Sequence, residues 1–358
     1  MKINLPGLRA YAVTRTLSQP ADLATAILTL GFVQIDPIRA PARAQDLILR
    51  HRVDGYRIGD LSSRFAALPL VEDFLHVYGV LPVASLGLLH PRRRQRIWRV
   101  EREHPRLARK IIDHIGRSGP IHPRDLTRAL GSTRVVNGWG GSSAATTRML
   151  EALHYRGALR VLRRDNGVKV YGLAPPFGAP LPLPLRADEL LRMLVRLYAP
   201  LQISSLRQLA AMVGRDSLPD ATRLRAFARL LKSEWLARGL VDGVEYLWPA
   251  GERPPAEAPA RVKLLAPFDP IVWDRRRFEH LWRWEYRFEA YTPPAKRRYG
   301  YYALPLLWRD RVIGWANVAL KSGRLDVRTG FVDKKPRDVR FARELEREID
   351  ALSRSFAL

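Results

Sequence analysis

The tripeptide Gln34-Ile35-Asp36 combines the side chains best suited to hydrolytic chemistry in this chain. In a β-strand, Gln34 and Asp36 would project from the same face and Ile35 from the opposite one. An amide beside a carboxylate can hold one water molecule: the amide fixes its position, and the carboxylate accepts its proton or stabilises a developing positive charge. A strand-end Asp before Pro37 is also a common turn former, so the tripeptide alone is a weak signal for catalysis.

Other familiar sites are missing from the sequence. The chain has no cysteine, which excludes disulfide scaffolds, thiolate nucleophiles, zinc fingers and iron–sulfur clusters. It has no Walker loop, no dinucleotide-binding glycine motif and no His-Glu-x-x-His, and its eight histidines show no metal-ligand spacing. We therefore expect neither a metal nor an organic cofactor.

The charge of the chain indicates a polyanionic partner. The 358 residues include 61 Lys and Arg against 35 Asp and Glu, which gives a formal net charge of +26. Only nine of the basic residues are lysine, and a GC-rich genome would also favour Arg, Ala, Leu and Pro. A basic protein without such a ligand is the alternative, but arginine is the better residue for gripping phosphates bidentately.

Composition also limits the class of protein. Hydrophobic residues make up 47% of the chain, enough for real cores, and the length suggests two or three domains. The longest apolar stretch, residues 26–33, is too short to cross a bilayer, and the first ten residues resemble no secretory signal. We expect a cytoplasmic, nucleoid-associated monomer without a membrane partner.

Residues 103–180 have the pattern of a winged helix. Helices are predicted over 105–117, 123–130 and 142–156, and the last ends at Arg156-Gly157. Two β-prone runs then flank Asp165-Asn166-Gly167, a strong hairpin signal. Three helices followed by a hairpin are the winged-helix plan.

The same plan recurs over residues 185–250. Its predicted elements are helices over 187–199, 205–213 and 222–238, a short strand over 201–203, and a wing over 240–248. Ile121 and Ile203 are separated by the same number of residues as Gly157 and Gly239, which favours a tandem repeat. Residues 1–102 are interpreted as a third, degenerate copy, with helices over 21–30, 42–51 and 71–80 and a strand over 32–35.

The chain changes character after a Pro-rich linker over 249–259. Short strands are predicted over 262–265, 301–308, 312–318 and 324–331, and a charged helix over 337–356. Residues 260–358 therefore predict a small β-barrel or curled sheet with a terminal helix. The expected fold class is mainly α with β (α+β): three winged-helix modules and a C-terminal barrel.

Several segments resemble the YcaQ/AlkZ-type crosslink-repair DNA glycosylases. Gly31-Phe-Val-Gln-Ile-Asp36 resembles the Q-x-D segment of the YcaQ branch, and His76 with Leu81-Pro82 resembles its E-x-W-x-H…P stretch. The most specific matches are Pro267–Pro270, Trp273–Arg275, Tyr286–Tyr291 and Lys296–Tyr302. The sequence departs from the pattern where Phe74 replaces Trp, and where Gly314-Trp315-Ala316-Asn317 replaces G-R-x-D.

The resemblance implies a monofunctional DNA glycosylase that hydrolyses the N-glycosidic bond of N7-alkylated purines and unhooks interstrand crosslinks. It implies catalytic roles for Gln34 and Asp36, a place near the scissile nucleotide for His76, and double-stranded DNA with alkylated or crosslinked purines as the partner. It also implies three tandem winged helices and a C-terminal barrel. No lysine nucleophile is required, and an open basic cleft would suit a crosslinked base that cannot leave the duplex.

Basic residues in three places are candidates for DNA contacts, each with an ordinary solvated surface as the alternative. They are Arg39 and Arg43 after Asp36; Arg160, Arg163, Arg164 and Lys169 on the hairpin; and Lys296, Arg297 and Arg298 between aromatic residues. Trp282 and Trp284 are expected in the core. The alternatives to an enzyme are a winged-helix regulator and a resistance protein that binds damaged DNA without turnover.

Overall fold

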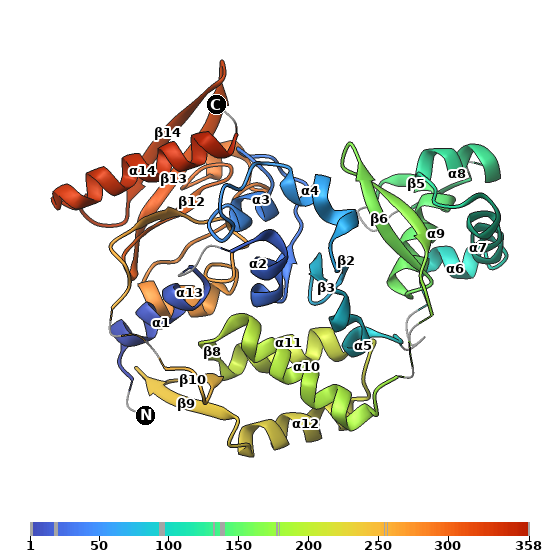
Figure 1. Cartoon of the computed structure of the whole chain (residues 1–358), viewed down its shortest axis with the longest axis horizontal. Coiled ribbons are helices and arrows are strands. Elements are labelled where there is room, and N and C mark those ends of the chain that lie inside the picture. Colours follow the sequence, from blue (N-terminus) through green and yellow to red (C-terminus); the bar gives the residue numbers. More distant parts are fainter. Residues whose placement is uncertain are drawn as a thin grey trace. The chain divides into compact units, whose positions relative to one another are not determined.

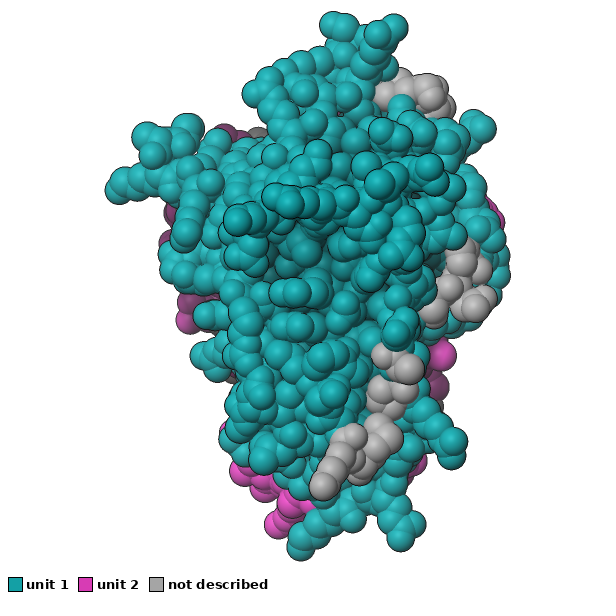
Figure 2. Space-filling view, turned by 90° about the vertical axis from the view of Figure 1, so that its left-hand side faces the viewer, with its two compact units in different colours: residues 1–61, 191–208, 229–358 teal, residues 62–190, 209–228 magenta. Residues whose placement is uncertain are grey.

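The computed structural model describes residues 3–17, 21–92, 97–131, 133–136, 140–176, 178, 180–253, 255 and 257–356. The chain forms two compact units, coloured separately in Figure 2. Unit 1 comprises residues 1–61, 191–208 and 229–358, and unit 2 comprises residues 62–190 and 209–228. Helices alternate with several small antiparallel sheets, so the predicted mixture of α and β structure is confirmed. The four module boundaries stay predictions.

The middle of unit 2 contains the helices and the hairpin predicted for residues 103–180. Its elements are α6 (Arg99–Glu103), α7 (Leu107–Ser118), α8 (Pro123–Leu130), α9 (Ala145–Tyr155), β6 (Leu159–Asp165) and β7 (Val168–Leu173), with a short β4–β5 ladder (Arg134–Val136, Ser142–Ala144). Asn166 and Gly167 have positive φ angles of 50° and 87°, as a tight hairpin turn requires. Ile111, Leu126 and Leu150 belong to the core that joins these elements.

The segment before this region corrects one prediction. Residues 71–80 are not helical; β2 (Leu70–Phe74) and β3 (Tyr78–Pro82) form an antiparallel hairpin in which Glu72 pairs with Val80. β-branched and aromatic residues at Val71, Phe74 and Tyr78 favour the extended conformation. The hairpin is followed by α5 (Leu86–Leu89), and α4 (Asp60–Arg64) precedes it.

The N-terminal part of unit 1 contains α1 (Leu5–Leu17), α2 (Leu23–Leu30), β1 (Val33–Gln34) and α3 (Ala44–Leu49). Asp22 caps α2 by accepting the backbone N–H groups of Ala24 and Thr25. Gly31 ends the helix at φ 68°, and a Cβ there would lie 2.7 Å from Leu197. The helices predicted over 21–30 and 42–51 are confirmed as α2 and α3. The strand ends at Gln34, so Asp36 lies beyond it.

The elements predicted for residues 185–250 are only partly correct. Its elements are α10 (Leu183–Tyr198), β8 (Leu201–Gln202), α11 (Ile203–Gly214), α12 (Asp220–Lys232), β9 (Leu236–Val241) and β10 (Val244–Pro249). The helix predicted over 222–238 is present as α12 but ends at Lys232, because β9 already includes Arg238. Gly239 therefore lies inside a strand, where a Cβ would be 2.8 Å from Trp248, and is not equivalent to Gly157 before β6.

The C-terminal strands of unit 1 form a four-stranded antiparallel sheet in the order β11 (Val262–Leu264), β12 (Leu304–Trp308), β13 (Arg311–Lys321) and β14 (Arg324–Phe331). Helix α14 (Val339–Ser355) lies along this sheet (Figure 1), and Phe341 contacts the rings of Trp308 and Phe331. Helix α13 (Arg275–Trp282) joins the same core, with Trp282 and Trp284 buried as predicted. Closure into a barrel stays a prediction.

Among the described residues, no helix is both long and apolar enough to cross a membrane.

Candidate active site

Asp36 is a buried carboxylate held in place by its neighbours. Only 8% of the Asp36 residue is exposed to solvent. The N–H of Asp36 donates to Gln45 Oε1 at 3.3 Å, and the N–H of Ile38 donates to Asp36 Oδ1 at 2.9 Å. Burial raises the pKa of the Asp36 carboxyl, and the Ile38 hydrogen bond only partly offsets this effect. The carboxylate is therefore a stronger base than an ordinary exposed aspartate.

Gln34 lies at the end of β1 and is half-buried. Because the strand stops there, the alternation of side chains that predicts a shared face for Gln34 and Asp36 does not extend to Asp36. The turn after Asp36 instead fixes the carboxylate through the Ile38 N–H. Gln45, which sequence reasoning missed, supplies the second anchor from the buried helix α3.

A buried ion pair connects the segment after α3 with one of the C-terminal motif segments. Arg52 Nη1 and Nη2 contact the two carboxylate oxygens of Asp269 at 2.8 and 3.0 Å, and Arg52 Nε donates to Thr16 O at 2.8 Å. Both side chains are almost completely buried. Pro267–Pro270 is one of the segments that resemble the family pattern, and here it is held to the segment after α3 within unit 1.

The segment over 289–302, which we call the aromatic–basic loop, is organised by Glu289. Its buried carboxylate accepts the backbone N–H groups of Arg298, Tyr299 and Gly300 at 2.7 to 3.1 Å. Burial alone would raise the pKa of Glu289, but these three donors lower it. Glu289 therefore stays ionised and fixes the backbone of this loop.

The aromatic–basic loop presents its cations on the surface. Lys296 and Arg298 are exposed, and Arg297 is half-buried with its Nε donating to Thr292 O at 2.8 Å. Tyr301 is 43% exposed, and the Arg297 guanidinium lies 5.1 Å from its ring centroid. A fixed backbone that carries cations and an exposed ring suits a nucleic-acid strand.

The residues that replace the family's G-R-x-D segment support this loop. Asn317 Nδ2 donates to Tyr299 O at 2.8 Å, and a side chain on Gly300, whose φ is 123°, would collide with Asn317. Trp315 packs against the rings of Trp284 and Tyr299. Trp315 and Asn317 thus contribute packing and one hydrogen bond to this loop.

The remaining basic candidates of unit 1 lie near Asp36 in the sequence. Arg39 is exposed in the turn after Asp36, and Arg43 occupies the N-cap position of α3, where it is half-buried.

In unit 2, two of the four hairpin cations contact the β2–β3 hairpin. Arg164 forms a bidentate ion pair with Glu72, at 2.6 and 2.7 Å, and Lys169 Nζ lies 3.6 Å from the ring centroid of Tyr78. Burial lowers the pKa of Lys169 to about 8. Arg163 is exposed but pairs with Asp165 at 3.0 Å. Only part of the predicted basic wing is therefore available to solvent.

His76 lies in the turn between β2 and β3 and is partly exposed. Burial lowers the pKa of its imidazole to about 4, so the ring is neutral at physiological pH. His76 can donate or accept a hydrogen bond there, but it supplies no positive charge for a phosphate.

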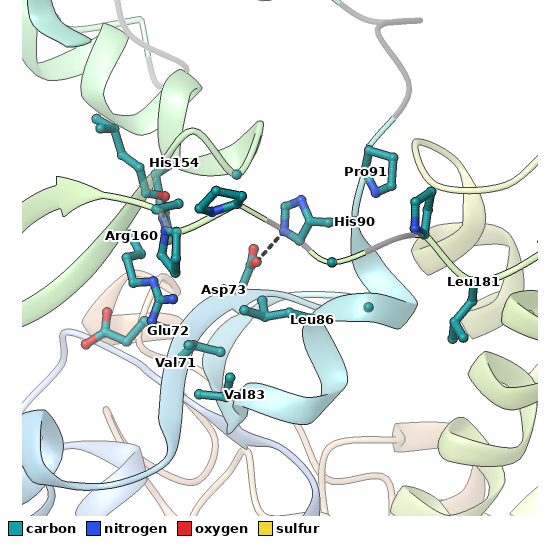
Figure 3. Close-up of a pocket in the computed structure, with 18 residues that line it drawn as sticks. Val71, Glu72, Asp73, Val83, Leu86, His90, Pro91, His154, Arg160 and Leu181 are labelled. Carbon is teal, nitrogen blue, oxygen red and sulfur yellow. Dashed lines mark hydrogen bonds and ion pairs between the residues drawn. The ribbon is translucent and has the colours of Figure 1, made fainter. Parts of the chain in front are cut away.

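Arg160 lines a pocket of about 630 Å³ within unit 2. Figure 3 shows its polar residues, including Asp73 and His90, which are 2.7 Å apart. Arg92 contacts the other oxygen of Asp73 at 2.9 Å, and burial lowers the pKa of His154, another lining residue, to about 4. This buried cluster was missed because Asp73 lies 17 and 19 residues before His90 and Arg92, without a recognisable motif.

Within the described part of the chain, no group of three or more His, Asp or Glu residues could hold a metal ion.

Comparison with known proteins agrees with this architecture. A family model described as DNA glycosylase AlkZ-like matches residues 27–355. Among solved structures, the fold is similar to that of Streptomyces sahachiroi DNA glycosylase AlkZ, with a TM-score of 0.65 and 15% sequence identity, over 100% of this chain and 98% of that one. At this identity, the structural likeness shows a shared fold.

Proposed function

This chain belongs to the AlkZ-like DNA glycosylase family, and we propose that it is a monofunctional enzyme that releases N7-alkylated purines from duplex DNA, including purines held in interstrand crosslinks. The family assignment favours an enzyme over the regulator and the binding-only resistance protein. The buried Asp36 carboxylate, two residues after Gln34, is the observation that carries the proposal.

The chemistry of the substrate suits this pair of residues. An N7-alkylated purine is positively charged, so the C1′–N9 bond can break with its electron pair moving onto the base, which leaves neutral. The sugar becomes an oxocarbenium-like cation, and water adds to C1′ while its proton passes to a base. The enzyme therefore needs an anion and a positioned water more than it needs a strong acid for the leaving group.

Asp36 and Gln34 have distinct roles in this reaction. The Asp36 carboxylate stabilises the cationic sugar and accepts the proton of the water, which its raised pKa favours. The Gln34 amide holds the water. One Asp36 oxygen already accepts the Ile38 N–H, so the turn orients the carboxylate before DNA binds. No step uses a lysine, so base release is not followed by strand cleavage.

The basic candidates are proposed to have two different roles. Lys296, Arg297, Arg298, Arg39 and Arg43 would contact phosphates, as would Arg160 and Arg163. Arg164 and Lys169 would instead support the hairpin through Glu72 and Tyr78. His76 would contribute a neutral hydrogen bond close to the scissile nucleotide.

Winged-helix modules are proposed to carry the hairpins. Residues 107–173 contain α7, α8, α9, β6 and β7, and Ile121 forms a bridge with Tyr171 of β7. Residues 183–249 contain α10, β8, α11, α12, β9 and β10, and Gln202 of β8 pairs with Tyr246 of β10. This repeated order supports two such modules, and we propose that the enzyme acts as a monomer.

The substrate proposal is tested with matched duplexes that contain N7-methylguanine, undamaged guanine, uracil or an N7–N7 guanine crosslink. We expect release of N7-methylguanine, conversion of the crosslink to single-strand-sized products, and no strand nicking before alkali treatment. Release of uracil without release of N7-methylguanine would contradict the proposed dependence on a cationic leaving group. Sedimentation of the free enzyme at 40.8 kDa would support the monomer.

A further inference from the structure

Tyr302 is the last residue of the aromatic–basic loop and lies two residues before strand β12. It is only 4% exposed, and its ring meets the ring of Phe288 edge to face, with centroids 5.3 Å apart. The ring is therefore fixed by packing, and the position of its hydroxyl oxygen is fixed with it.

The hydroxyl of Tyr302 is buried but has no hydrogen-bond partner within the described residues. Two other tyrosines of unit 1 are different: Tyr286 donates to Ala303 O at 2.7 Å, and the Tyr299 hydroxyl accepts the Nε1–H of Trp284 at 3.1 Å. Buried polar groups in folded proteins are nearly always paired, so an unpaired, rigidly held hydroxyl points to a ligand.

Asp36 lies within electrostatic range of this hydroxyl. Burial raises the pKa of Tyr302, and the negative charge of Asp36 raises it further, ahead of smaller contributions from Tyr286 and Tyr301. No charged side chain contributes to the pKa shift of Asp36 itself. Tyr302 therefore stays protonated and can donate a hydrogen bond.

We propose that Tyr302 is a positioning residue that donates its hydroxyl hydrogen to the attacking water and so orients this water against Asp36. The inference rests on the proposed function, because it assigns Asp36 as the group that accepts the water's proton. In this arrangement, Tyr302 occupies one lone pair of the water and Asp36 accepts one of its hydrogens. The second lone pair is then directed at C1′ of the nucleotide.

The test uses the full-length enzyme and an N7-methylguanine duplex in single-turnover assays across pH, with wild type, Tyr302→Phe, Tyr286→Phe and Asp36→Asn. We expect Tyr302→Phe to release base roughly tenfold more slowly at neutral pH, as is typical when one hydrogen bond is removed, with unchanged DNA affinity. Its acid limb should move to higher pH, because the water-mediated donor no longer stabilises the Asp36 anion. Tyr286→Phe should stay within about twofold of wild type, since one structural hydrogen bond is removed away from the water.

Three results would overturn the inference in different ways. If Tyr302→Phe matches wild type while Asp36→Asn is inactive, Tyr302 has no such role and the proposed function stands. If Tyr302→Phe and Tyr286→Phe are slowed equally without a shift of the acid limb, Tyr302 is only a packing residue. If wild type itself releases no N7-methylguanine, the proposed function fails and the inference fails with it.

Discussion

Asp36 is a buried carboxylate. No cationic side chain is among the causes of its pKa shift. Such a group is costly to ionise, and folded proteins retain it mainly where a function uses the raised basicity. A water-derived proton and a cationic sugar are both suitable partners for it. The cost should therefore be visible in the stability of the free enzyme.

We predict that Asp36→Asn raises the melting temperature at neutral pH. The pKa of Asp36 is raised in the folded state, so its favourable contribution is fully present below the unfolded pKa of about 3.9 and is lost as pH rises through the folded value. Asparagine retains an oxygen to accept the Ile38 N–H but carries no charge. The gain should disappear at acidic pH.

Differential scanning calorimetry between pH 4 and pH 8 measures this effect, with Asp54→Asn as the control, because Asp54 is an exposed aspartate nearby in the sequence. A lower melting temperature for Asp36→Asn than for wild type at pH 8 would show that the carboxylate is stabilised rather than strained by its site.

The candidate catalytic residues were predictable from the sequence, but their surroundings were not. Gln34 and Asp36 follow from residue types and spacing, together with the family resemblance. The anchors Gln45 and Ile38 depend on the conformation of the turn after β1, which spacing does not specify. Arg164 is a clearer case: its partner Glu72 is 92 residues away, so a solvent-exposed wing was the natural prediction.

At the scale of elements, the buried Arg52–Asp269 pair links the α3 segment to the C-terminal motif segment. Removing one partner of a buried, hydrogen-bonded ion pair leaves an uncompensated charge, which costs roughly 3–5 kcal/mol. We therefore predict that Asp269→Asn lowers the free energy of unfolding by about this amount. The asparagine oxygen can still accept the Ile271 N–H, so the loss reports on the ion pair.

Urea unfolding measures this decrease, with Glu103→Gln as a matched control. Glu103 pairs with Arg99 in an exposed position, with 39% and 61% of the side chains accessible, so its replacement should cost less than about 1 kcal/mol. Equal decreases for the two variants would contradict a structural role specific to the buried pair.

Element prediction succeeded where local patterns decide the structure. The hairpin around Asn166-Gly167 needs only the turn residues and the flanking β-prone runs, and α14 needs only its amphipathic pattern. The β2–β3 hairpin was missed because its apolar spacing fits a helix as well as a strand over so few residues. The Gly157–Gly239 equivalence failed because an equal offset does not establish an equal place in the fold.

At the scale of the whole molecule, the structure separates two groups among the cations that give the net charge of +26. Some cations are neutralised within the fold, as Arg52 and Arg164 are, whereas Lys296 and Arg298 remain exposed on a backbone that Glu289 holds. Replacing Lys296, Arg297 and Arg298 with alanine should weaken binding to all duplexes. It should also reduce the slope of log affinity against log salt by up to about 0.9 for each phosphate that the variant no longer neutralises.

Fluorescence anisotropy over a range of salt concentrations tests this prediction. The control is the alanine triple variant of Arg340, Arg343 and Arg354, which are exposed on α14 and give the same net charge. If both triple variants change the slope equally, net charge rather than the aromatic–basic loop controls DNA binding.

The most direct test of the account is single-turnover release of N7-methylguanine from duplex DNA by wild type, Asp36→Asn and Asp54→Asn, with DNA affinity measured for each. We predict that wild type and Asp54→Asn release the base at similar rates. Asp36→Asn should be at least about 100-fold slower, as expected when a catalytic base is removed, while binding the duplex with unchanged affinity. Base release by Asp36→Asn at the wild-type rate would contradict the assignment of Asp36 as the catalytic carboxylate.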